Sequence, residues 1–371
     1  MRWLALVLTL ALACSGDDDA SSDAGPAGRP DGAAPVDGGG EDAGAGGGDD
    51  AGPGTDAGGG VDAGVPAGSV PMFVAVGWGG RRITSCDGGR TWIADQQEAP
   101  EGEDDWHRPY TPKALAWGGG AFVFLTGWGN PSTAWVSTDG VSWTAHALET
   151  TYGGVGWDDG RFVLVGNRNV AVTDDLFETV EVLEIEAPSY DRDAAAFEGI
   201  WVSGADGEVE TRVAGGSWAR LASCSGQRHT AIGVRGGFAA GLGRMVSFGD
   251  GGATCVVDAT TGADLGAGDL GVGSVDGYGA FVGDAFWMVT GGAIHASTDG
   301  LSWSSRALPG GVDFDRVARA EDGTYVGVGG GDRFYWSDDG ETWTRADAPA
   351  GNGILRVVAG WGAPSAQCPA P

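Results

Sequence analysis

A short motif built from turn-forming residues and a tryptophan recurs along this chain and constrains its fold more than any other feature. It reads Ser-x-Asp-Gly-x-Ser/Thr-Trp, with one extra residue in the first copy. The aspartate carboxylate can accept hydrogen bonds from backbone N–H groups that follow it, and the glycine takes the positive φ of a tight turn. Each copy therefore predicts a β-turn leading into a strand, with the tryptophan packed between neighbouring sheets. The intact copies are Ser85–Trp92, Ser137–Trp143, Ser297–Trp303 and Ser337–Trp343.

Degenerate copies of the motif lie between the intact ones. Thr173–Val180 keeps the aspartate, Thr211–Trp218 keeps the glycine and the tryptophan, and Phe248–Cys255 keeps the aspartate but has a cysteine at the tryptophan position. Successive tryptophan positions are then 51, 37, 38, 37, 48 and 40 residues apart. A period near 40 residues is that of a four-stranded propeller blade, so seven copies predict seven blades.

The motif resembles the Asp-box, or BNR, repeat of the sialidase-like β-propeller superfamily. One aspartate per turn, on separate turns, cannot assemble a shared catalytic or metal site, so we interpret the motif residues as structural. The structural set is Asp87, Trp92, Asp139, Trp143, Asp175, Asp250, Asp299, Trp303, Asp339 and Trp343.

Short apolar strands, glycine-rich turns and the absence of an amphipathic helical period predict an all-β fold. The first blade lacks its own first strand, and the last apolar segment of the chain supplies one. We therefore predict a seven-bladed propeller over residues 70–371, in which Ile354–Gly360 pairs with Met72–Gly77. This closure would remove the free sheet edges. The two longest spacings between motif tryptophan positions, 51 and 48 residues, are interpreted as an insert between blades one and two, Asp95–Pro112, and as a loop between blades five and six, Ala259–Gly271.

The N-terminus reads as an export signal. Residues 1–13 hold Arg2 and an apolar run that ends in small residues before Cys14. The sequence Ala11-Leu12-Ala13-Cys14 resembles a bacterial lipobox, which implies a lipidated Cys14, although the leucine lies one place nearer the cysteine than usual. Ala11-x-Ala13 also suits ordinary signal peptidase. Both interpretations mean export, to the outer membrane or cell surface by a lipid anchor, with a periplasmic or secreted protein as the alternatives.

Residues 14–69 form a predicted linker of almost only Gly, Ala, Asp, Pro and Ser. This segment has no aromatic residue and Arg29 is its only basic one, so it cannot build a core and we expect it to be disordered. Directly after a lipobox, such a segment is typical of the tether of a surface lipoprotein. Calcium binding by its aspartates is disfavoured because their spacing is irregular.

The net charge of −30 is shared between the linker and the predicted propeller. Residues 15–69 carry 12 acidic residues and one basic residue, which leaves 39 acidic and 19 basic residues from position 70 onward. This excess argues against nucleic acid and against anionic membrane surfaces as partners. We therefore expect membrane contact through the lipid anchor only, and a monomer.

The remaining cysteines predict two disulfides, for which three connectivities exist. Cys86 lies at the turn between strands three and four, and Cys368 follows the closing strand on the same face, so topology favours this pair. Cys224–Cys255 then follows only by exclusion, and the two residues could lie on opposite faces. The sequence has no Cys/His cluster of the kind that binds zinc, so we expect no metal and no cofactor.

Catalytic signatures are missing from the sequence. The resemblance to sialidases would imply an Arg-Ile-Pro-type motif, three carboxylate-binding arginines and six blades, whereas this chain lacks the motif and has seven repeats. We therefore expect a non-catalytic scaffold that binds a protein or glycan ligand. The alternative is a glycoside hydrolase of sialidase-like or xyloglucanase-like type, which would need two facing carboxylates in a cleft.

A ligand is expected on the face opposite the Asp-box turns, where strand four leads to the next blade and strand two leads to strand three. Aromatic residues lie beside arginines in these loops, a combination that suits sugar stacking or a protein hot spot. We expect Trp106 and Trp128 to form an aromatic platform at the rim of the central channel. The candidate ligand-face residues are Trp106, His107, Arg108, Tyr110, Trp128, Tyr152, Tyr190, Arg192, His229 and Arg316.

Overall fold

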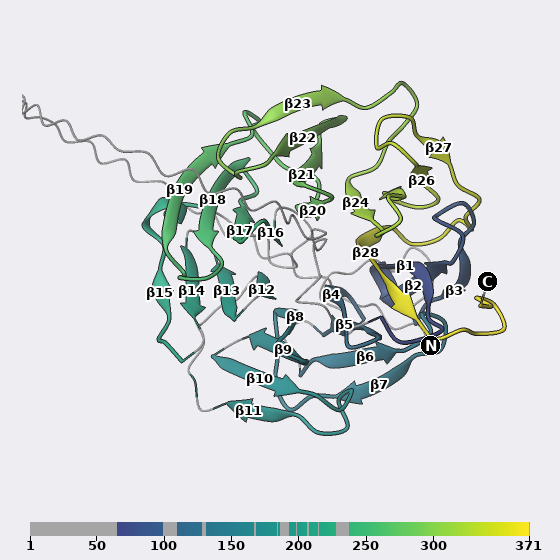
Figure 1. Cartoon of the computed structure of the whole chain (residues 1–371), viewed down its shortest axis with the longest axis horizontal. Helices are drawn as coiled ribbons and strands as arrows, with labels where there is room; N and C mark the ends of the chain where they lie inside the picture. The colour runs from purple at the N-terminus through teal and green to yellow at the C-terminus, as the bar shows by residue number, and fades with distance from the viewer. Residues whose placement is uncertain are drawn as a thin grey trace, which may run out of the picture. The chain divides into compact units, whose positions relative to one another are not determined.

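The computed structural model describes residues 65–98, 110–127, 131–166, 168–183, 185, 193–197, 199–205, 208–213, 215–227 and 237–370. These residues form seven four-stranded antiparallel sheets arranged as blades around a central axis (Figure 1). The predicted seven-bladed propeller is confirmed. Within the described ranges, no helix has both the length and the hydropathy needed to cross a membrane.

The first four blades each run from an innermost strand to an outermost one. Blade 1 contains β28 (Ile354–Gly362), β1 (Val70–Gly77), β2 (Arg81–Ser85) and β3 (Ile93–Gln96), with the 3-10 turn η1 (Trp78–Gly80) between β1 and β2. Blade 2 contains β4 (Pro112–Gly118), β5 (Ala121–Thr126), β6 (Thr133–Ser137) and β7 (Thr144–Ala147). Blade 3 contains β8 (Gly154–Asp158), β9 (Arg161–Gly166), β10 (Asn169–Thr173) and β11 (Glu181–Leu183). Blade 4 contains β12 (Asp193–Phe197), β13 (Ile200–Ala205), β14 (Glu208–Val213) and β15 (Ala219–Arg220), followed by the 3-10 turn η2 (Ala222–Cys224).

The last three blades follow the same order. Blade 5 contains β16 (Gly237–Gly241), β17 (Arg244–Phe248), β18 (Ala253–Asp258) and β19 (Asp264–Asp269). Blade 6 contains β20 (Ala280–Val282), β21 (Ala285–Thr290), β22 (Ala293–Ser297) and β23 (Ser304–Ala307). Blade 7 contains β24 (Arg316–Arg319), β25 (Tyr325–Val328), β26 (Phe334–Ser337) and β27 (Thr344–Arg345).

The ring is closed by the C-terminal strand, as the sequence predicts. β28 pairs antiparallel with β1, with Met72 opposite Gly360 and Gly77 opposite Ile354. Beyond β28, Cys368 forms a disulfide with Cys86 at the end of β2, with a Cα–Cα distance of 5.7 Å. Hydrogen bonds and a covalent link therefore both hold the last strand in the first blade.

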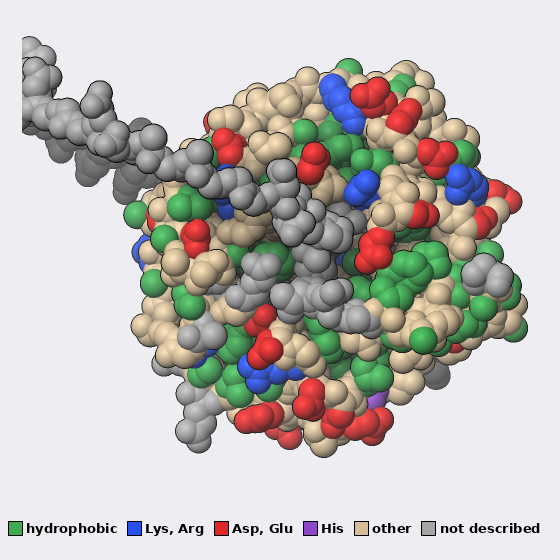
Figure 2. Space-filling model, in the orientation of Figure 1, with side chains coloured by type: hydrophobic (Ala, Val, Ile, Leu, Met, Phe, Trp, Pro, Cys, Tyr) green, Lys and Arg blue, Asp and Glu red, His purple; other side chains and the backbone are tan. Residues whose placement is uncertain are grey.

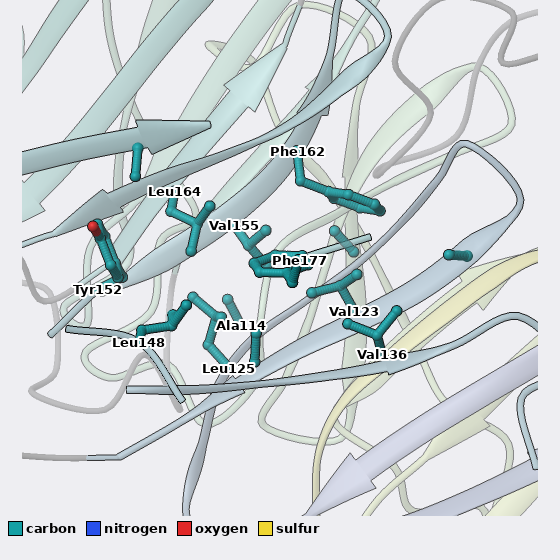
Figure 3. Close-up of a cluster of buried hydrophobic side chains, with 14 residues drawn as sticks. Ala114, Val123, Leu125, Val136, Leu148, Tyr152, Val155, Phe162, Leu164 and Phe177 are labelled. Atoms are coloured by element: carbon teal, nitrogen blue, oxygen red, sulfur yellow. The ribbon is translucent and has the colours of Figure 1, made fainter. Parts of the chain in front are cut away.

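The hydrophobic core is divided among the junctions between blades. The described residues form seven clusters of buried side chains, and each cluster joins two consecutive blades. Between blades 2 and 3, Phe162 and Phe177 lie against Val123 and Val136 (Figure 3). Because both faces of a blade are covered by its neighbours, strands such as β5 are apolar on both faces and read as continuous apolar runs rather than as an alternation.

Five turns between the third and fourth strands use an aspartate in the way the sequence predicts, and we call them Asp turns. In blade 7, Asp339 accepts hydrogen bonds from the backbone N–H groups of Thr342 and Glu341 at 2.6 and 2.8 Å. The Ser337 hydroxyl donates to the same carboxylate at 2.9 Å. These bonds favour the charged form and hold the pKa of Asp339 well below its usual range. The five aspartates are Asp87, Asp139, Asp175, Asp299 and Asp339.

The Asp turn also fastens its blade to the preceding one. Gly340 has a φ of +70°, and its carbonyl accepts hydrogen bonds from the Trp343 indole at 3.1 Å and from Arg306 of blade 6 at 2.5 Å. The carbonyl of Gly300 in blade 6 likewise accepts a hydrogen bond from Thr254 of blade 5, at 2.9 Å. The motif therefore forms a turn and a contact between blades at once. Of its tryptophans, Trp92 and Trp343 are buried, whereas Trp143 and Trp303 are half-buried.

Blade 5 departs from the arrangement that the sequence predicts. Asp250 lies in the turn between the second and third strands, and Cys255 lies inside the third strand, β18. The turn between the third and fourth strands belongs instead to Asp258, whose carboxylate accepts hydrogen bonds from the backbone N–H and the hydroxyl of Thr261 at 2.7 and 2.8 Å. The segment predicted to be a loop between blades holds β19 (Asp264–Asp269).

The second disulfide joins Cys224 to Cys255, with a Cα–Cα distance of 5.4 Å. Cys224 ends η2, directly after the outer strand of blade 4, and Cys255 lies in the third strand of blade 5. A separation on opposite faces would require Cys255 to begin a fourth strand. Because it lies in the third strand instead, the two residues meet across the junction between blades 4 and 5.

The Asp turns predict how stability depends on pH. Because the pKa of Asp339 is lowered by folding, its ionised form stabilises the native state above the unfolded pKa of 3.8, and this contribution is lost as the pH falls through the folded pKa. We expect Asp339→Asn to have a lower urea midpoint than the wild type at pH 7. The difference between the two midpoints should shrink as the pH falls toward about 2.5. Asp338→Asn is the matched control, since Asp338 is exposed and pairs with Arg90 at the surface. A gap between Asp339→Asn and the wild type that is equally wide at both pH values would contradict this assignment.

Candidate functional site: the central cavity

A cavity of about 890 Å³ lies on the axis of the propeller. The innermost strands of all seven blades line it: β28, β4, β8, β12, β16, β20 and β24 (Figure 1). These strands all start on one face of the propeller and end on the other, so the cavity has one end where the strands begin and one where they finish. The residues at the two ends differ in chemistry. Between the ends, its wall consists mainly of small apolar side chains, among them Ala116, Ala195, Ala196, Ala239, Ala318 and Val357.

The end where the inner strands finish is aromatic. Trp117, Trp157 and Trp361 come from adjacent blades 2, 3 and 1, and all three line the cavity. The Trp117 indole donates a hydrogen bond to the Trp361 carbonyl at 2.8 Å. Trp117 also lies against Gly360, where an added Cβ would be only 2.4 Å from the ring. Trp157 packs in the same way on Gly118 of the preceding blade, so these rings fix the contact between blades and form part of the cavity wall.

The end where the inner strands begin is basic. Arg316 of blade 7 donates from Nε to the Leu355 carbonyl of blade 1 at 3.1 Å. Arg356 of blade 1 donates from Nη2 to the Lys113 carbonyl of blade 2 at 2.9 Å, and Lys113 donates from Nζ to the Tyr152 carbonyl before blade 3 at 3.2 Å. Three cations thus link four consecutive blades across the ring closure. We call Lys113, Arg316 and Arg356 the cation relay.

All three relay residues are almost fully buried, with exposures of 4% for Lys113, 7% for Arg316 and 4% for Arg356. Arg316 forms an ion pair with Asp315. Burial lowers the pKa of Arg316, and the nearby charge of Arg356 acts in the same direction, while Asp315 opposes both. The Arg356 guanidinium lies over the Tyr278 ring of blade 6, 3.8 Å from its centroid, a cation–π contact. No carboxylate of the described residues forms an ion pair with Arg356.

The acidic groups of the propeller lie mostly elsewhere. On the face shown in Figure 2, acidic side chains are spread over the blades and basic side chains are few. Of the residues that the structure describes, the carboxylates lining the cavity are Glu321 and Asp322, which are neighbours in one turn at the aromatic end. Among the described residues, no group of three metal-ligating side chains could hold an ion.

The structure places three of the predicted ligand-face residues. Tyr110 is exposed. Tyr152 is a core residue rather than a surface one: it is 1% exposed, and burial, with a smaller effect of Glu149, raises its pKa to about 12. Arg316 lines the cavity. The predictions for the remaining residues lie outside the described ranges: Trp106, His107, Arg108, Trp128, Tyr190, Arg192 and His229, as does the predicted lipidation at Cys14.

Sequence reasoning missed most of the cavity residues. No motif marks Arg356 or Tyr278, although both line the basic end. One signal was present: a basic residue recurs near the start of three inner strands, at Lys113, Arg316 and Arg356, and Lys113 is the only lysine in the chain. In a protein that otherwise uses arginine, a repeated position of this kind indicates a shared role.

No family model and no curated protein matches this sequence. Solved structures do match it. YCF48 bound to D1 peptide is 19% identical, with 69% of this chain and 84% of that chain covered and a TM-score of 0.45. YCF48 from Cyanidioschyzon merolae is 14% identical, with coverages of 80% and 96% and a TM-score of 0.46. Apo AztD from Citrobacter koseri is 10% identical, with coverages of 80% and 99% and a TM-score of 0.49. At these identities the likeness extends to the fold alone.

The contact between Trp117 and Gly360 predicts a sensitive position in the cavity wall. Gly360→Ala would place a methyl group 2.4 Å from the ring and force Trp117 to move, so we expect a loss of about 1–3 kcal/mol in the free energy of unfolding. Urea denaturation monitored by tryptophan fluorescence measures it. Gly310→Ala is the control, because nothing lies within 4 Å of its added Cβ. Equal stability of the two variants would show that the wall is not closely packed there.

Proposed function

We propose that this protein is an exported, lipid-anchored cell-envelope lipoprotein whose propeller is a non-catalytic scaffold that binds a protein or glycan ligand. The observation that carries the proposal is the central cavity, which combines apolar walls with an aromatic end and a basic end. Ligand sites are typically concave, largely apolar and equipped with a few converging polar groups. We further propose that the propeller belongs with the Asp-box, sialidase-like group, because its Asp turns follow the repeat residue by residue.

The use of the carboxylates supports binding rather than catalysis. The aspartates of the Asp turns already accept hydrogen bonds within their own turns, as Asp87 and Asp299 do. Glu321 and Asp322 at the cavity share one turn, whereas glycoside hydrolysis requires two carboxyl groups on opposite sides of a bond. Arg316 and Arg356 at the cavity donate hydrogen bonds to backbone carbonyls of neighbouring blades, and a cation can bind an anionic ligand without itself acting as an acid or a nucleophile.

Two features support export. The disulfides Cys86–Cys368 and Cys224–Cys255 are of the kind that persists in oxidising compartments. The lipobox-like segment before Cys14 and the acidic linker behind it supply the anchor and the tether.

The proposed anchor predicts a change of location for Cys14→Ser. Without the thiol no lipid can be attached, so we expect the protein to move from the membrane fraction to the soluble fraction and from the detergent phase to the aqueous phase. Mass spectrometry of the N-terminal peptide checks the lipid directly. Ser15→Ala serves as the control and should remain in the membrane. A Cys14→Ser protein that stays in the membrane fraction would refute the lipid anchor.

The proposed binding role predicts saturable binding without turnover. We expect the wild type to bind a glycan on an array or a purified envelope protein, and to leave a sialoside and β-glucans intact. The Trp106→Ala/Trp128→Ala variant tests whether the ligand face carries this binding, and we expect at least about a tenfold loss, as for interface hot spots. The binding of a Tyr110→Ala variant, measured in the same assay, is the comparison, because Tyr110 is an exposed aromatic residue of the predicted ligand face. Hydrolysis of any of these substrates would overturn the non-catalytic role.

A further inference from the structure

The basic end of the central cavity has a charge that sets it apart from the rest of the propeller. Residues 70–371 are strongly acidic, yet Arg316 and Arg356 line one end of an apolar cavity, and Arg356 donates a hydrogen bond to the carbonyl of Lys113. We propose that this cavity binds a small organic acid, with the carboxylate at the basic end and an apolar body along the wall. The inference rests on the proposed role as a binding scaffold and specifies the chemistry of one ligand.

Arg356 is the group that would hold the carboxylate. It lines the cavity, and its chain neighbour Leu355 and the next blade's Lys113 supply carbonyl acceptors for Nη1 and Nη2 at 2.8 and 2.9 Å. A guanidinium carries five N–H donors in a rigid fork, so these two bonds leave donors for a ligand. Tyr278 covers one face of the guanidinium and fixes its plane. The planar fork is therefore oriented before any ligand arrives, which suits a carboxylate.

The charge balance favours an anion at this position. A buried cation is costly unless an opposite charge or hydrogen bonds compensate it. Asp315 compensates Arg316, but Arg356 has only carbonyl oxygens and the Tyr278 ring among the described residues. A bound carboxylate would supply the missing negative charge, and the low polarity of the surroundings would strengthen the interaction.

The wall of the cavity determines the body of the ligand. Between the two ends the lining side chains are chiefly alanine, valine and phenylalanine, such as Ala239, Phe238 and Val317. A sugar placed along this section would leave its hydroxyl groups without partners, so a glycan would bind at the loops of the ligand face, whereas an aliphatic or aromatic body suits the apolar wall. Trp117 and Trp157 at the far end offer apolar surface for the end of such a body. The volume of about 890 Å³ lies within the range of small-molecule sites.

The test compares an acid with its neutral amide on the full mature protein. We expect 4-phenylbutyrate to bind with one-to-one stoichiometry in calorimetry, and 4-phenylbutyramide to bind at least about tenfold more weakly, as expected for loss of a charge-assisted hydrogen bond. The matching phosphonate, 3-phenylpropylphosphonate, distinguishes a carboxylate site from a general anion site. Equal affinity for acid and amide, tighter binding of the phosphonate, or no binding of the acid at millimolar concentration would each overturn the proposal.

Variants locate the site. Arg356→Gln should weaken 4-phenylbutyrate by about tenfold or more and leave the amide unchanged. Arg333→Gln is the matched control: Arg333 also carries a charge that acts on Arg316, but it pairs with Asp313 and does not line the cavity. An equal loss of 4-phenylbutyrate affinity in both variants would mean that only the net charge matters, and it would overturn the proposed binding site at Arg356. Urea midpoints check folding, and if Arg356→Gln does not fold, the comparison of acid and amide on the wild type still decides.

The outcome separates this inference from the proposed function. Binding of a glycan or envelope protein without binding of 4-phenylbutyrate would overturn the organic-acid site and leave the scaffold role standing. Binding of the acid that Arg356→Gln abolishes would support the site. Failure of every ligand class would remove the scaffold role and the inference together.

Discussion

Each blade of this propeller depends on the apolar contact with its two neighbours, because every cluster of buried side chains in the described part of the chain is shared by two blades. The seven clusters of buried side chains lie between blades, so each strand is covered on both faces only when the ring is complete. The Asp turns add directed bonds to this apolar contact. A residue such as Gly340 holds its own turn through Trp343 and the preceding blade through Arg306. Local turn chemistry and global assembly are thus carried by the same few residues.

The cation relay applies the same logic at the centre of the molecule. Arg316, Arg356 and Lys113 each donate to a backbone carbonyl of the next blade, across the place where the two ends of the chain meet. Burying three cations has a cost that hydrogen bonds to carbonyls only partly offset. The relay links the blades at the closure by hydrogen bonds and leaves positive charge at the cavity, which is where we propose that a ligand contributes. Architecture and recognition are coupled at this end of the channel.

The fold could be predicted from the sequence because its signal repeats. The intact motifs at Asp87 and Asp339 fix a strand, a turn and a period at once, and the unmatched strand at Ile354 identifies the closure. The prediction for blade 5 was wrong for a related reason: Asp250 and Gly251 imitate the motif, but the chain uses Asp258, which has no glycine directly after it. A turn motif predicts a tight turn but not whether that turn joins the second and third strands of a blade or the third and fourth.

The site was harder to predict because its residues come from seven separate strands. The side chain of Tyr152 carries the usual marks of a ligand contact in the sequence, yet it is buried in the packing between blades 2 and 3. Arg356 lies in no recognisable motif and shares only its position near the start of an inner strand with two other basic residues, because its role depends on Tyr278 and Lys113, which are distant in the chain. Burial and convergence of this kind arise only from the three-dimensional arrangement.

The closing strand also sets the order in which the protein can mature. β1 is made near the start of the propeller, but its partner β28 is among the last segments to be synthesised. Until the chain is complete, the first blade therefore has an unpaired edge. Cys86 stays a free thiol until Cys368 is synthesised 282 residues later, and Cys224 and Cys255 are synthesised before then as competing partners. A ring of this topology cannot fold blade by blade from its N-terminus, because the ribosome must finish the chain before the first blade can be completed. A chain truncated anywhere before β28 therefore exposes the edge of β1 and keeps a free thiol at Cys86, and both features distinguish it from the complete protein.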